Sequence, residues 1–300
     1  GRGLMVTYHH MPTPEGEPKR FLVLIAESDG EAEIQISPEY MRFETGLMNL
    51  GPLDSLSRRE LEVLALISQG MTTDEINTLV HDYTLAHDAY PAPLNYGGTR
   101  DRVPFPKSVC TSVNECVCHG IPGPKTLRSG DILNIDVTVI LDGWYGDTSR
   151  MFFVGAPSVK AKLLSEVTYE CLMRGIAAAR SGNTLGDIGH AIQSYAEAMR
   201  FSVVRDFTGH GLGQTFHCAP TVLHYGNPGT GLTLQPGMIF TIEPMINAGK
   251  AETKILGDGW TAVTRDKSLS AQFEHSIGIT EGDPEIFTLS PAGYTQPPYC

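Results

Sequence analysis

The stretch ILNIDVTVILDGWYGDTSRMFFV, residues 132–154, predicts two antiparallel strands joined by a tight turn. Residues 132–141 alternate between apolar and polar side chains and are rich in β-branched residues, which favours a strand. Asp142-Gly143 is typical of a two-residue hairpin turn. Residues 144–154 then form the return strand. We therefore expect a hairpin here and a sheet that is built outward from it.

This hairpin carries two carboxylates that its register brings together. With a two-residue turn at Asp142-Gly143, Asp147 faces Thr138, and Asp136 lies two residues along on the same face. Diagonal neighbours on one face are about 7–8 Å apart. That separation suits two carboxylates that converge on metal ions about 3.5–4 Å apart. Two solvent-facing strand acids are the alternative, but the apolar residues around Asp136 make it the weaker one.

Three further residues have the chemistry of metal ligands. His210 lies between glycines in FTGHGLGQTFHCAPTVLHY (207–225), where the backbone can approach a partner closely, and His217 follows it. Glu243, in MIFTIEPMI, and Glu274, in QFEHS, lie in apolar, strand-like runs, where a carboxylate is costly unless it is paired or bound to metal. Four carboxylates and one imidazole suit Mn, Fe or Co and tolerate Zn.

The rest of the chain shows shorter elements. We expect an irregular arm over residues 1–20, a strand over 21–26 with 32–36 as its hairpin partner, and an irregular stretch over 37–56. Helical spacing predicts helices over 58–69, ended by Gly70, and over 158–180. Strand patterns cover 238–246, 260–265 and 269–280, and the proline-bearing tail 290–300 should be irregular.

One internal repeat suggests two similar halves. GMTTDEI (70–76) precedes a helical stretch to about His87, and GNTLGDI (182–188) precedes another at 189–199. In each copy a threonine two residues after the glycine is followed three residues later by an acid, as in a capping box. Each half should therefore contain a helix packed on strands.

Composition excludes several function classes. The 300 residues fit one large domain with an extension. The chain has 22 Lys and Arg against 34 Asp and Glu, a net charge of −12, which argues against nucleic acid as the main partner. No apolar run approaches the roughly 20 residues of a membrane helix. The six cysteines form no CxxC pair, so we expect reduced thiols and a cytoplasmic protein.

A second similarity points elsewhere but is incomplete. SRRELEVLALISQGMTTDEI resembles the start of the helix-turn-helix domain of LuxR-type regulators. The similarity ends at about Ile76, where HDYTLAHDAYPAPLNY replaces a recognition helix. A DNA reader needs that helix in the major groove, so we disfavour DNA binding.

The metal-binding segments together resemble one enzyme family. NIDVTVILDGWYGDTSR, GHGLGQTFH, TIEPM and QFEHS closely resemble type I methionine aminopeptidases over residues 58–289. The resemblance implies an α+β pita-bread fold, a curved antiparallel sheet flanked by helices with two pseudo-symmetric halves. It divides the chain into an N-terminal extension (1–57), the aminopeptidase domain (58–289) and a C-terminal tail (290–300).

The same resemblance implies a reaction. The family removes the N-terminal methionine of nascent proteins and peptides by attack of a hydroxide that bridges two divalent metal ions. By resemblance Asp147 and Glu274 bridge both ions, Asp136 completes one site, and His210 with Glu243 completes the other. Glu243 also serves as the proton shuttle. The implied partners are nascent chains, at the ribosome, and the implied state is a monomer.

Resemblance also assigns the substrate site. His119, in CHGIPGP, matches the histidine that places the substrate, and His217 matches the one that contacts the scissile carbonyl or the next peptide nitrogen. The implied methionine pocket is lined by Tyr96, Phe105, Cys110, Phe216 and Trp260.

Three features depart from the family, and two related functions compete. The link between Tyr96 and Phe105 is long and charged, the first helix is shortened to residues 58–69, and Cys218 follows His217 where a glutamate is common. Prolidase and aminopeptidase P are rival pita-bread hydrolases, but they carry longer N-terminal domains than the one available here. A non-catalytic pita-bread binding protein is the other rival, and it should lack some of the ligands.

Overall fold

The computed structural model describes residues 7–8, 21–22, 71–100, 103–290 and 293–297, and the predicted hairpin lies at its centre. Strand β6 (Ile132–Leu141) pairs with β7 (Trp144–Phe153), and Thr138 lies opposite Asp147. Asp142 and Gly143 have φ values of 50° and 80°, as a type I′ turn requires. The register prediction is therefore confirmed, with the return strand one residue shorter than expected.

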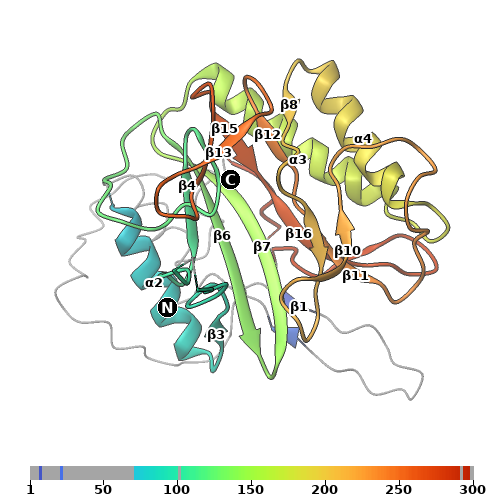
Figure 1. The fold of residues 1–300 in the computed structure, drawn as a ribbon, viewed down its shortest axis with the longest axis horizontal. Helices are drawn as coiled ribbons and strands as arrows, with labels where there is room; N and C mark the ends of the chain where they lie inside the picture. Colours follow the sequence, from blue (N-terminus) through green and yellow to red (C-terminus); the bar gives the residue numbers. More distant parts are fainter. Residues whose placement is uncertain (1–6, 9–20, 23–70, 101–102, 291–292, 298–300) are drawn as a thin grey trace.

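A nine-stranded sheet grows from both sides of this hairpin (Figure 1). Its main path runs β10-β9-β11-β16-β7-β6-β3, with β17 on β16 and β4 on β6. All of the pairings are antiparallel. The added strands are β3 (Tyr90–Pro91), β4 (Cys110–Val113), β9 (Gly209–Gly211), β10 (Cys218–Val222), β11 (Ile239–Ile242), β16 (Glu274–Gly278) and β17 (Glu285–Ile286).

Two three-stranded sheets continue from the large one. Their orders are β15-β12-β8 and β13-β14-β5. The chain passes from β11 into β12 at Glu243-Pro244 and from β15 into β16 at Phe273, so the predicted strands 238–246 and 269–280 are each broken in two. Their members are β5 (Cys116–Cys118), β8 (Ser202–Val203), β12 (Met245–Asn247), β13 (Thr253–Ile255), β14 (Ala262–Thr264) and β15 (Ser270–Gln272).

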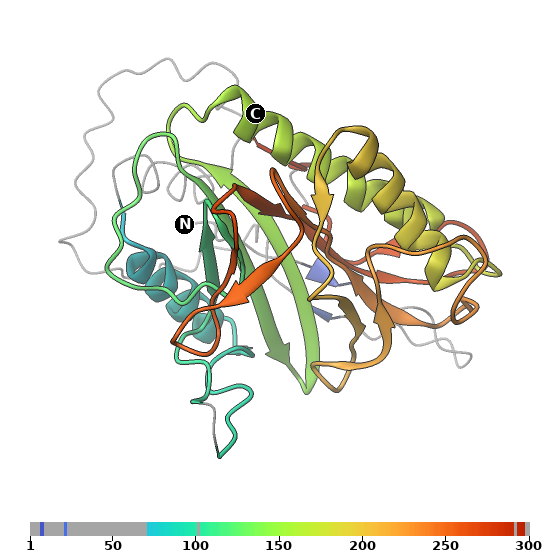
Figure 2. The same cartoon turned by 45° about the horizontal axis from the view of Figure 1, so that its top comes forward.

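The helices pack on one face of the sheet. Helix α3 (Val159–Ala178), capped by Ser158, confirms the predicted long helix, and α4 (Leu185–Ala198) packs beside it (Figure 2). Helix α4 begins earlier than the expected Gly189, because the capping box of Thr184 starts it. Helix α2 (Thr73–Ala86) buries Ile76 in a cluster with Val137 and Val139 of β6. Both helices lie on the same face, because Val137 under α2 and Ile242 beside Gly175 of α3 lie on the same side in the strand registers.

The two faces of β6 contact different parts of the molecule. Its odd-numbered residues Leu133, Ile135, Val137 and Val139 belong to the core under α2, together with Ile76. Because side chains alternate along a strand, Asn134, Asp136 and Thr138 point to the other face. There Asn134 donates to the carbonyl oxygen of Gln272 on β15. The face that carries Asp136 therefore looks toward the second half of the chain.

The predicted repeat is confirmed in both copies. Thr72 with Glu75, and Thr184 with Asp187, form capping boxes at the starts of α2 and α4. Each cap threonine also forms a lone β-bridge, Thr72 with Thr126 and Thr184 with Thr233. These partners begin the similar segments TLRSGDI (126–132) and TLQPGMI (233–239), which lead into β6 and β11. The repeat thus extends from the helices into the strands.

The predictions for the two ends of the chain can be compared with the structure only in part. The predicted helix 58–69, the candidate strand 32–36 and the irregular stretch 37–56 lie outside the described residues. Thr7–Tyr8 (β1) pairs with Phe21–Leu22 (β2), so the expectation of an irregular arm is wrong for Thr7–Tyr8, whereas Phe21–Leu22 lies in the predicted strand 21–26. Tail residues 293–297 have no helix or strand, as expected. Among the described helices, none combines the length and apolarity that crossing a membrane requires.

Candidate metal centre

The hairpin positions two of the predicted ligands on one face. Asp136 is opposite Ser149, and Asp147 is opposite Thr138, which places the two carboxylates diagonally across β6 and β7. The hydroxyl of Thr138 donates to Oδ1 of Asp147 over 2.8 Å. Burial raises the pKa of Asp136 well above its usual value, and the nearby charges of Asp147 and Glu243 raise it further. The hairpin argument for convergence is therefore confirmed.

His210 is held by neighbours that require glycine on both of its sides. A Cβ atom at Gly209 would lie 2.3 Å from the carbonyl oxygen of Thr241, and one at Gly211 would lie 2.1 Å from that of Ala219. Strand β9 therefore lies closer to its neighbours than any side chain at these two positions allows. The backbone N–H of His210 donates to the hydroxyl of Thr241 over 3.0 Å.

The imidazole of His210 faces the carboxylates through Nε2. Its Nδ1 lies 3.1 Å from the carbonyl oxygen of Gly211, so that nitrogen carries the hydrogen and donates it. Nε2 lies 3.5 Å from Asp147 and 3.6 Å from Glu243. Burial lowers the pKa of His210, but Asp147 and Glu243 outweigh it and raise the pKa to about 9. When neutral, this imidazole offers the Nε2 lone pair to the carboxylate cluster.

Glu243 lies in the gap between β11 and β12. Its carboxylate accepts from the hydroxyl of Thr241 over 2.7 Å and from the side-chain amide of Gln272 over 3.3 Å. Its backbone N–H donates to Nε2 of His224 over 3.1 Å. Burial raises the pKa of Glu243 to about 7, with a further contribution from the charge of Asp147.

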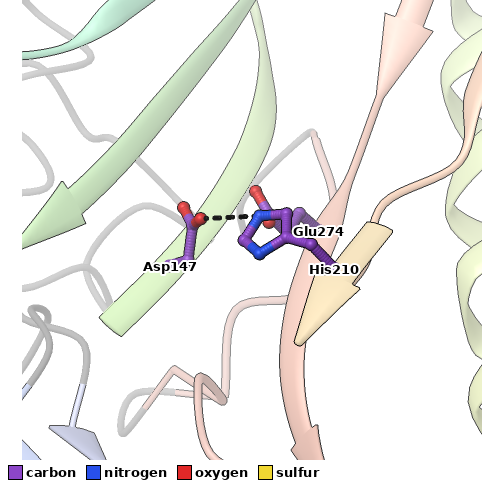
Figure 3. A group of neighbouring side chains, drawn as sticks. All are labelled: Asp147, His210 and Glu274. Atoms are coloured by element: carbon purple, nitrogen blue, oxygen red, sulfur yellow. Dashed lines mark ion pairs between the residues drawn. The ribbon is translucent and has the colours of Figure 1, made fainter. Parts of the chain in front are cut away.

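Glu274 opens strand β16 beside the hairpin. It is paired with Ser149 of β7, and its side chain is directed at Asp147 and His210 (Figure 3). One ligand atom from each of these three residues lies within 4.8 Å of the others. Burial raises the pKa of Glu274 well above its usual range, followed by the charges of Asp147, Glu243 and Asp136.

The five predicted ligands lie close together, with Asp147, Glu243 and Glu274 buried and Asp136 and His210 half-buried. Asp147, Glu243 and Glu274 are 4%, 9% and 2% exposed, and electrostatic effects link all four carboxylates. One imidazole cannot balance four carboxylates. Without a further cation, the cluster would keep its charge only at a high desolvation cost. Oxygen donors with one imidazole fit divalent ions such as Mn, Fe, Co or Zn.

The two predicted substrate histidines lie beside this cluster. The ring of His217 is 4.2 Å from that of His210, between centroids, and stacks on Phe216 at 4.0 Å. Burial and the neighbouring His210 lower the pKa of His217 to about 4. His119, with φ of 54°, follows β5 and contacts the rings of Phe207 at 5.4 Å and Trp260 at 6.3 Å.

The predicted pocket residues fall into two contacting groups. Phe105, Cys110 and Trp260 form a buried apolar cluster with Ile121, and Cys110 is paired with Asp136 across β4 and β6. Tyr96 instead packs edge-on against Phe216 at 4.8 Å. Between Tyr96 and Phe105, the carbonyl oxygen of Val103 accepts a hydrogen bond from Nε1 of Trp260.

Sequence reasoning missed the residues that support the ligands. Thr241, Gln272 and His224 bind Glu243, and Tyr145 stacks on Phe216 at 5.4 Å. The position of Thr241, two residues before Glu243 on the same strand face, is the one signal that alternation provides. The partners of Gln272 and His224 depend on contacts between distant segments.

The thiols are free among the described residues, as expected. Cys110, Cys116, Cys118 and Cys171 are buried, whereas Cys218 is exposed at the start of β10. Strand β10 is the outermost strand on the main path of the large sheet, which leaves Cys218 at the surface.

Comparisons with known proteins agree on one family. Residues 55–281 match the model of metallopeptidase family M24. Methionine aminopeptidase of Rickettsia prowazekii is 59% identical over 78% of this chain and 88% of its own length. Methionine aminopeptidase A of a Synechocystis strain is 53% identical, over 78% of this chain and 96% of its own length.

Solved structures show the same architecture. The crystal structure of methionine aminopeptidase from Rickettsia prowazekii aligns with a TM-score of 0.71, covering 76% of this chain and 92% of that one. The enzyme from Thermotoga maritima, 41% identical, aligns at 0.72 over 76% of this chain and 90% of that one. An X-Pro aminopeptidase from Thermotoga maritima, at 20% identity and 0.57, shares the fold alone over 78% of this chain and 57% of its own. These structures confirm the predicted α+β pita-bread fold.

Proposed function

The chain belongs to metallopeptidase family M24, and from this premise we propose that it removes the N-terminal methionine of peptides and nascent proteins. The observation that carries the proposal is the cluster of metal-ligand side chains formed by Asp136, Asp147, His210, Glu243 and Glu274. Relatives named methionine aminopeptidase cover most of the chain, whereas the X-Pro enzymes share only its fold. A protein that had lost catalysis would not need the complete cluster.

We propose that the cluster holds two divalent ions. By the family resemblance Asp147 and Glu274 would be shared by both ions, and their proximity, with one ligand atom of each within 4.8 Å, supports this role. Asp136 would complete one site, and His210 with Glu243 the other. Mn, Fe, Co and Zn all accept this set of donors. Divalent ions at this position supply Lewis acidity and a water molecule of lowered pKa.

Glu243 is the proposed proton shuttle. Its Oε1 lies 3.6 Å from Nε2 of His210, inside the cluster where the attacking water would be held. The hydroxyl of Thr241 and the amide of Gln272 hold its two oxygens in place. Glu243 would accept a proton from the attacking water and return it to the amine that leaves.

The two histidines are the proposed contacts with the reacting peptide bond. His217 would donate a hydrogen bond to the carbonyl oxygen as negative charge develops on it, which stabilises the transition state. His119 would orient the substrate, and it is the alternative to Glu243 as the group that delivers the proton to the leaving nitrogen. Both rings lie beside the pocket aromatics, His217 against Phe216 and His119 against Trp260.

The methionine side chain would enter the space between the two aromatic groups. Phe105, Cys110 and Trp260 form one wall, and Tyr96 with Phe216 forms the other. An apolar lining with a thiol suits an unbranched thioether. By the same proposal the substrates are nascent polypeptides at the ribosome in the cytoplasm, and the working state is a monomer.

Metal titration with two peptides tests this function. We expect the chelated protein to be inactive and to recover cleavage of Met-Ala-Ser as two equivalents of Mn, Fe, Co or Zn bind. Calorimetry with the same samples gives the number of ions. A Gly-Pro dipeptide serves as the control substrate and should stay intact.

Two results would contradict the proposal. Cleavage of Gly-Pro without cleavage of Met-Ala-Ser would assign the chain to the X-Pro enzymes. Cleavage of Met-Ala-Ser that persists after complete removal of metal would show that the carboxylate cluster has another purpose.

A further inference from the structure

One side-chain contact at the centre has no role in the function proposed so far. The hydroxyl of Tyr96 lies 2.6 Å from Nδ1 of His217. The two residues are 121 positions apart, and their rings are inclined, with centroids 5.1 Å apart. A pocket wall needs the ring of Tyr96 but not its hydroxyl. The short distance shows a hydrogen bond to the histidine that faces the substrate.

Backbone hydrogen bonds and a ring contact hold Tyr96 in place. Its carbonyl oxygen accepts from the N–H of Phe105 over 2.9 Å, and the neighbouring Asn95 donates to Phe105 over 2.8 Å. Its ring packs against Phe216. At the next residue, Gly97, a Cβ atom would lie 2.7 Å from the ring of Trp260. Two backbone hydrogen bonds therefore hold Asn95 and Tyr96 against Phe105.

The contact determines which nitrogen of His217 remains for the substrate. In a neutral imidazole one nitrogen carries the hydrogen and the other accepts, and the partner of one decides the state of the other. If the tyrosine hydroxyl donates to Nδ1, the hydrogen of His217 lies on Nε2. Nε2 is then a donor, as stabilisation of a carbonyl oxygen requires. In the opposite tautomer Nε2 could only accept.

We propose that Tyr96 is a positioning residue: its hydroxyl donates to Nδ1 of His217 and thereby keeps Nε2 of His217 as the hydrogen-bond donor to the substrate. This inference rests on the proposed function, in which His217 faces the peptide bond. It gives the hydroxyl of Tyr96 a duty separate from that of its ring, which lines the pocket.

Kinetics of paired variants separate the two duties. Tyr96→Phe keeps the ring and removes the hydroxyl, so kcat for Met-Ala-Ser should fall by about fivefold to tenfold with little change in KM. Tyr96→Leu also removes the ring and should raise KM as well. A purely structural role for the hydroxyl would instead lower the melting temperature of Tyr96→Phe without this division between kcat and KM.

A glutamine at position 217 provides the matched background. Its side-chain amide is a donor that needs no partner to select a tautomer. In His217→Gln, adding Tyr96→Phe should therefore change kcat less than twofold. An equal loss in both backgrounds would overturn the proposal, because Tyr96 would then act independently of the histidine.

Nuclear magnetic resonance tests the tautomer without relying on activity. With nitrogen-15 in the histidines of the zinc-loaded protein, His217 should show a hydrogen on Nε2 and none on Nδ1, and Tyr96→Phe should shift this pattern. A hydrogen on Nδ1 in the unmodified protein would refute the inference. Failure to cleave Met-Ala-Ser would refute the proposed function, whereas normal cleavage with an unaffected Tyr96→Phe variant would refute only the role of Tyr96.

Discussion

The two halves of the chain bring carboxylates to one site by different backbone routes. In the first half, Asp136 and Asp147 lie within β6 and β7, two unbroken ten-residue strands. In the second half, Glu243 follows the end of β11 and Glu274 is the first residue of β16. Asp136 and Glu243 are nevertheless equivalent, since both lie ten residues after the threonine that bridges the helix cap of their half.

The difference arises where the second half changes sheets. Strand β11 pairs with β16 up to Ile242 and His275, and Glu243 and Glu274 are the next residues of the two strands. Beyond them the chain joins the sheet of β12 and β15. Pro244 has no amide hydrogen to continue the ladder. The second-half glutamates thus lie where the chain changes sheets, while the first-half aspartates lie inside continuous strands.

The side chain of Glu243, at the change of sheets, has more hydrogen-bond partners than that of Asp147 inside its strand. Asp147 has a hydroxyl partner on the facing strand, Thr138. Glu243 is held by Thr241 and Gln272 through its side chain and by His224 through its backbone. The strand register alone places Asp136 and Asp147 together, whereas packing between distant segments places Glu243 and Glu274. The predictions below test this contrast.

The largest effect should come from removing one ligand in each half. We expect Asp136→Ala and Glu274→Ala each to lower kcat/KM for Met-Ala-Ser by about a thousandfold or more, because both complete the proposed metal sites. Circular dichroism and the melting temperature of the metal-free proteins should show that both variants fold. Full activity in either variant would refute the mechanism.

The next effect concerns the strand that carries His210. Gly211→Ala should lower the free energy of unfolding by about 3 kcal/mol, because its Cβ would lie 2.1 Å from a carbonyl oxygen. Gly213→Ala is the matched control, since its Cβ would meet nothing closer than 3.7 Å and should change stability by less than about 0.5 kcal/mol. Urea unfolding measures both, and equal stabilities would show that close approach does not explain the glycines.

Two threonine variants compare the halves directly. Thr241→Val removes the donor to Glu243 and the acceptor of the His210 N–H, so we expect a loss of about 2 kcal/mol in transition-state stabilisation. Thr138→Val removes one bond to Asp147 and should cost about 1 kcal/mol. The ratio of kcat/KM values gives both numbers. A larger loss for Thr138→Val would contradict the view that Glu243, at the change of sheets, depends more on its supporting residues than Asp147 does.

The last prediction concerns how the free energy of unfolding of the metal-free protein varies with pH. The pKa values of Asp136 and Glu274 are raised, that of Glu243 to about 7 and that of His210 to about 9. The folded state therefore binds more protons than the unfolded state, and this stabilisation is lost as pH rises through the raised values. We expect the free energy of unfolding of the metal-free protein to increase as the pH falls from 8.5 to 6.5.

Below this range a second group of residues opposes the gain. The lowered pKa values of buried histidines mean that the unfolded state binds more protons below about pH 6.5, which destabilises the fold as pH falls. These histidines are His217, with a pKa of about 4, and His224 and His275, with pKa values of about 3. Saturating metal should abolish the gain between pH 8.5 and 6.5, and a metal-free protein that loses stability in that range would contradict the electrostatic account.

The hairpin, the caps and the types of ligand were predictable from the sequence. Asp142-Gly143 fixes the register of β6 and β7 locally, and so the convergence of Asp136 and Asp147 follows from counting residues. The capping boxes of Thr72 and Thr184 are likewise local. Buried glutamates in apolar runs were visible as candidates, since a lone buried charge is unfavourable.

Tertiary structure alone decided how the second half reaches the site. The breaks at Glu243-Pro244 and Phe273, the close approach at Gly209 and Gly211, and the bond from Tyr96 to His217 join segments far apart in the chain. Strand alternation carries no information on when a strand changes sheets or which distant partner meets a side chain. The sequence by itself determined the residues and the first-half geometry; only long-range packing decided where the remaining ligands and their supports would lie.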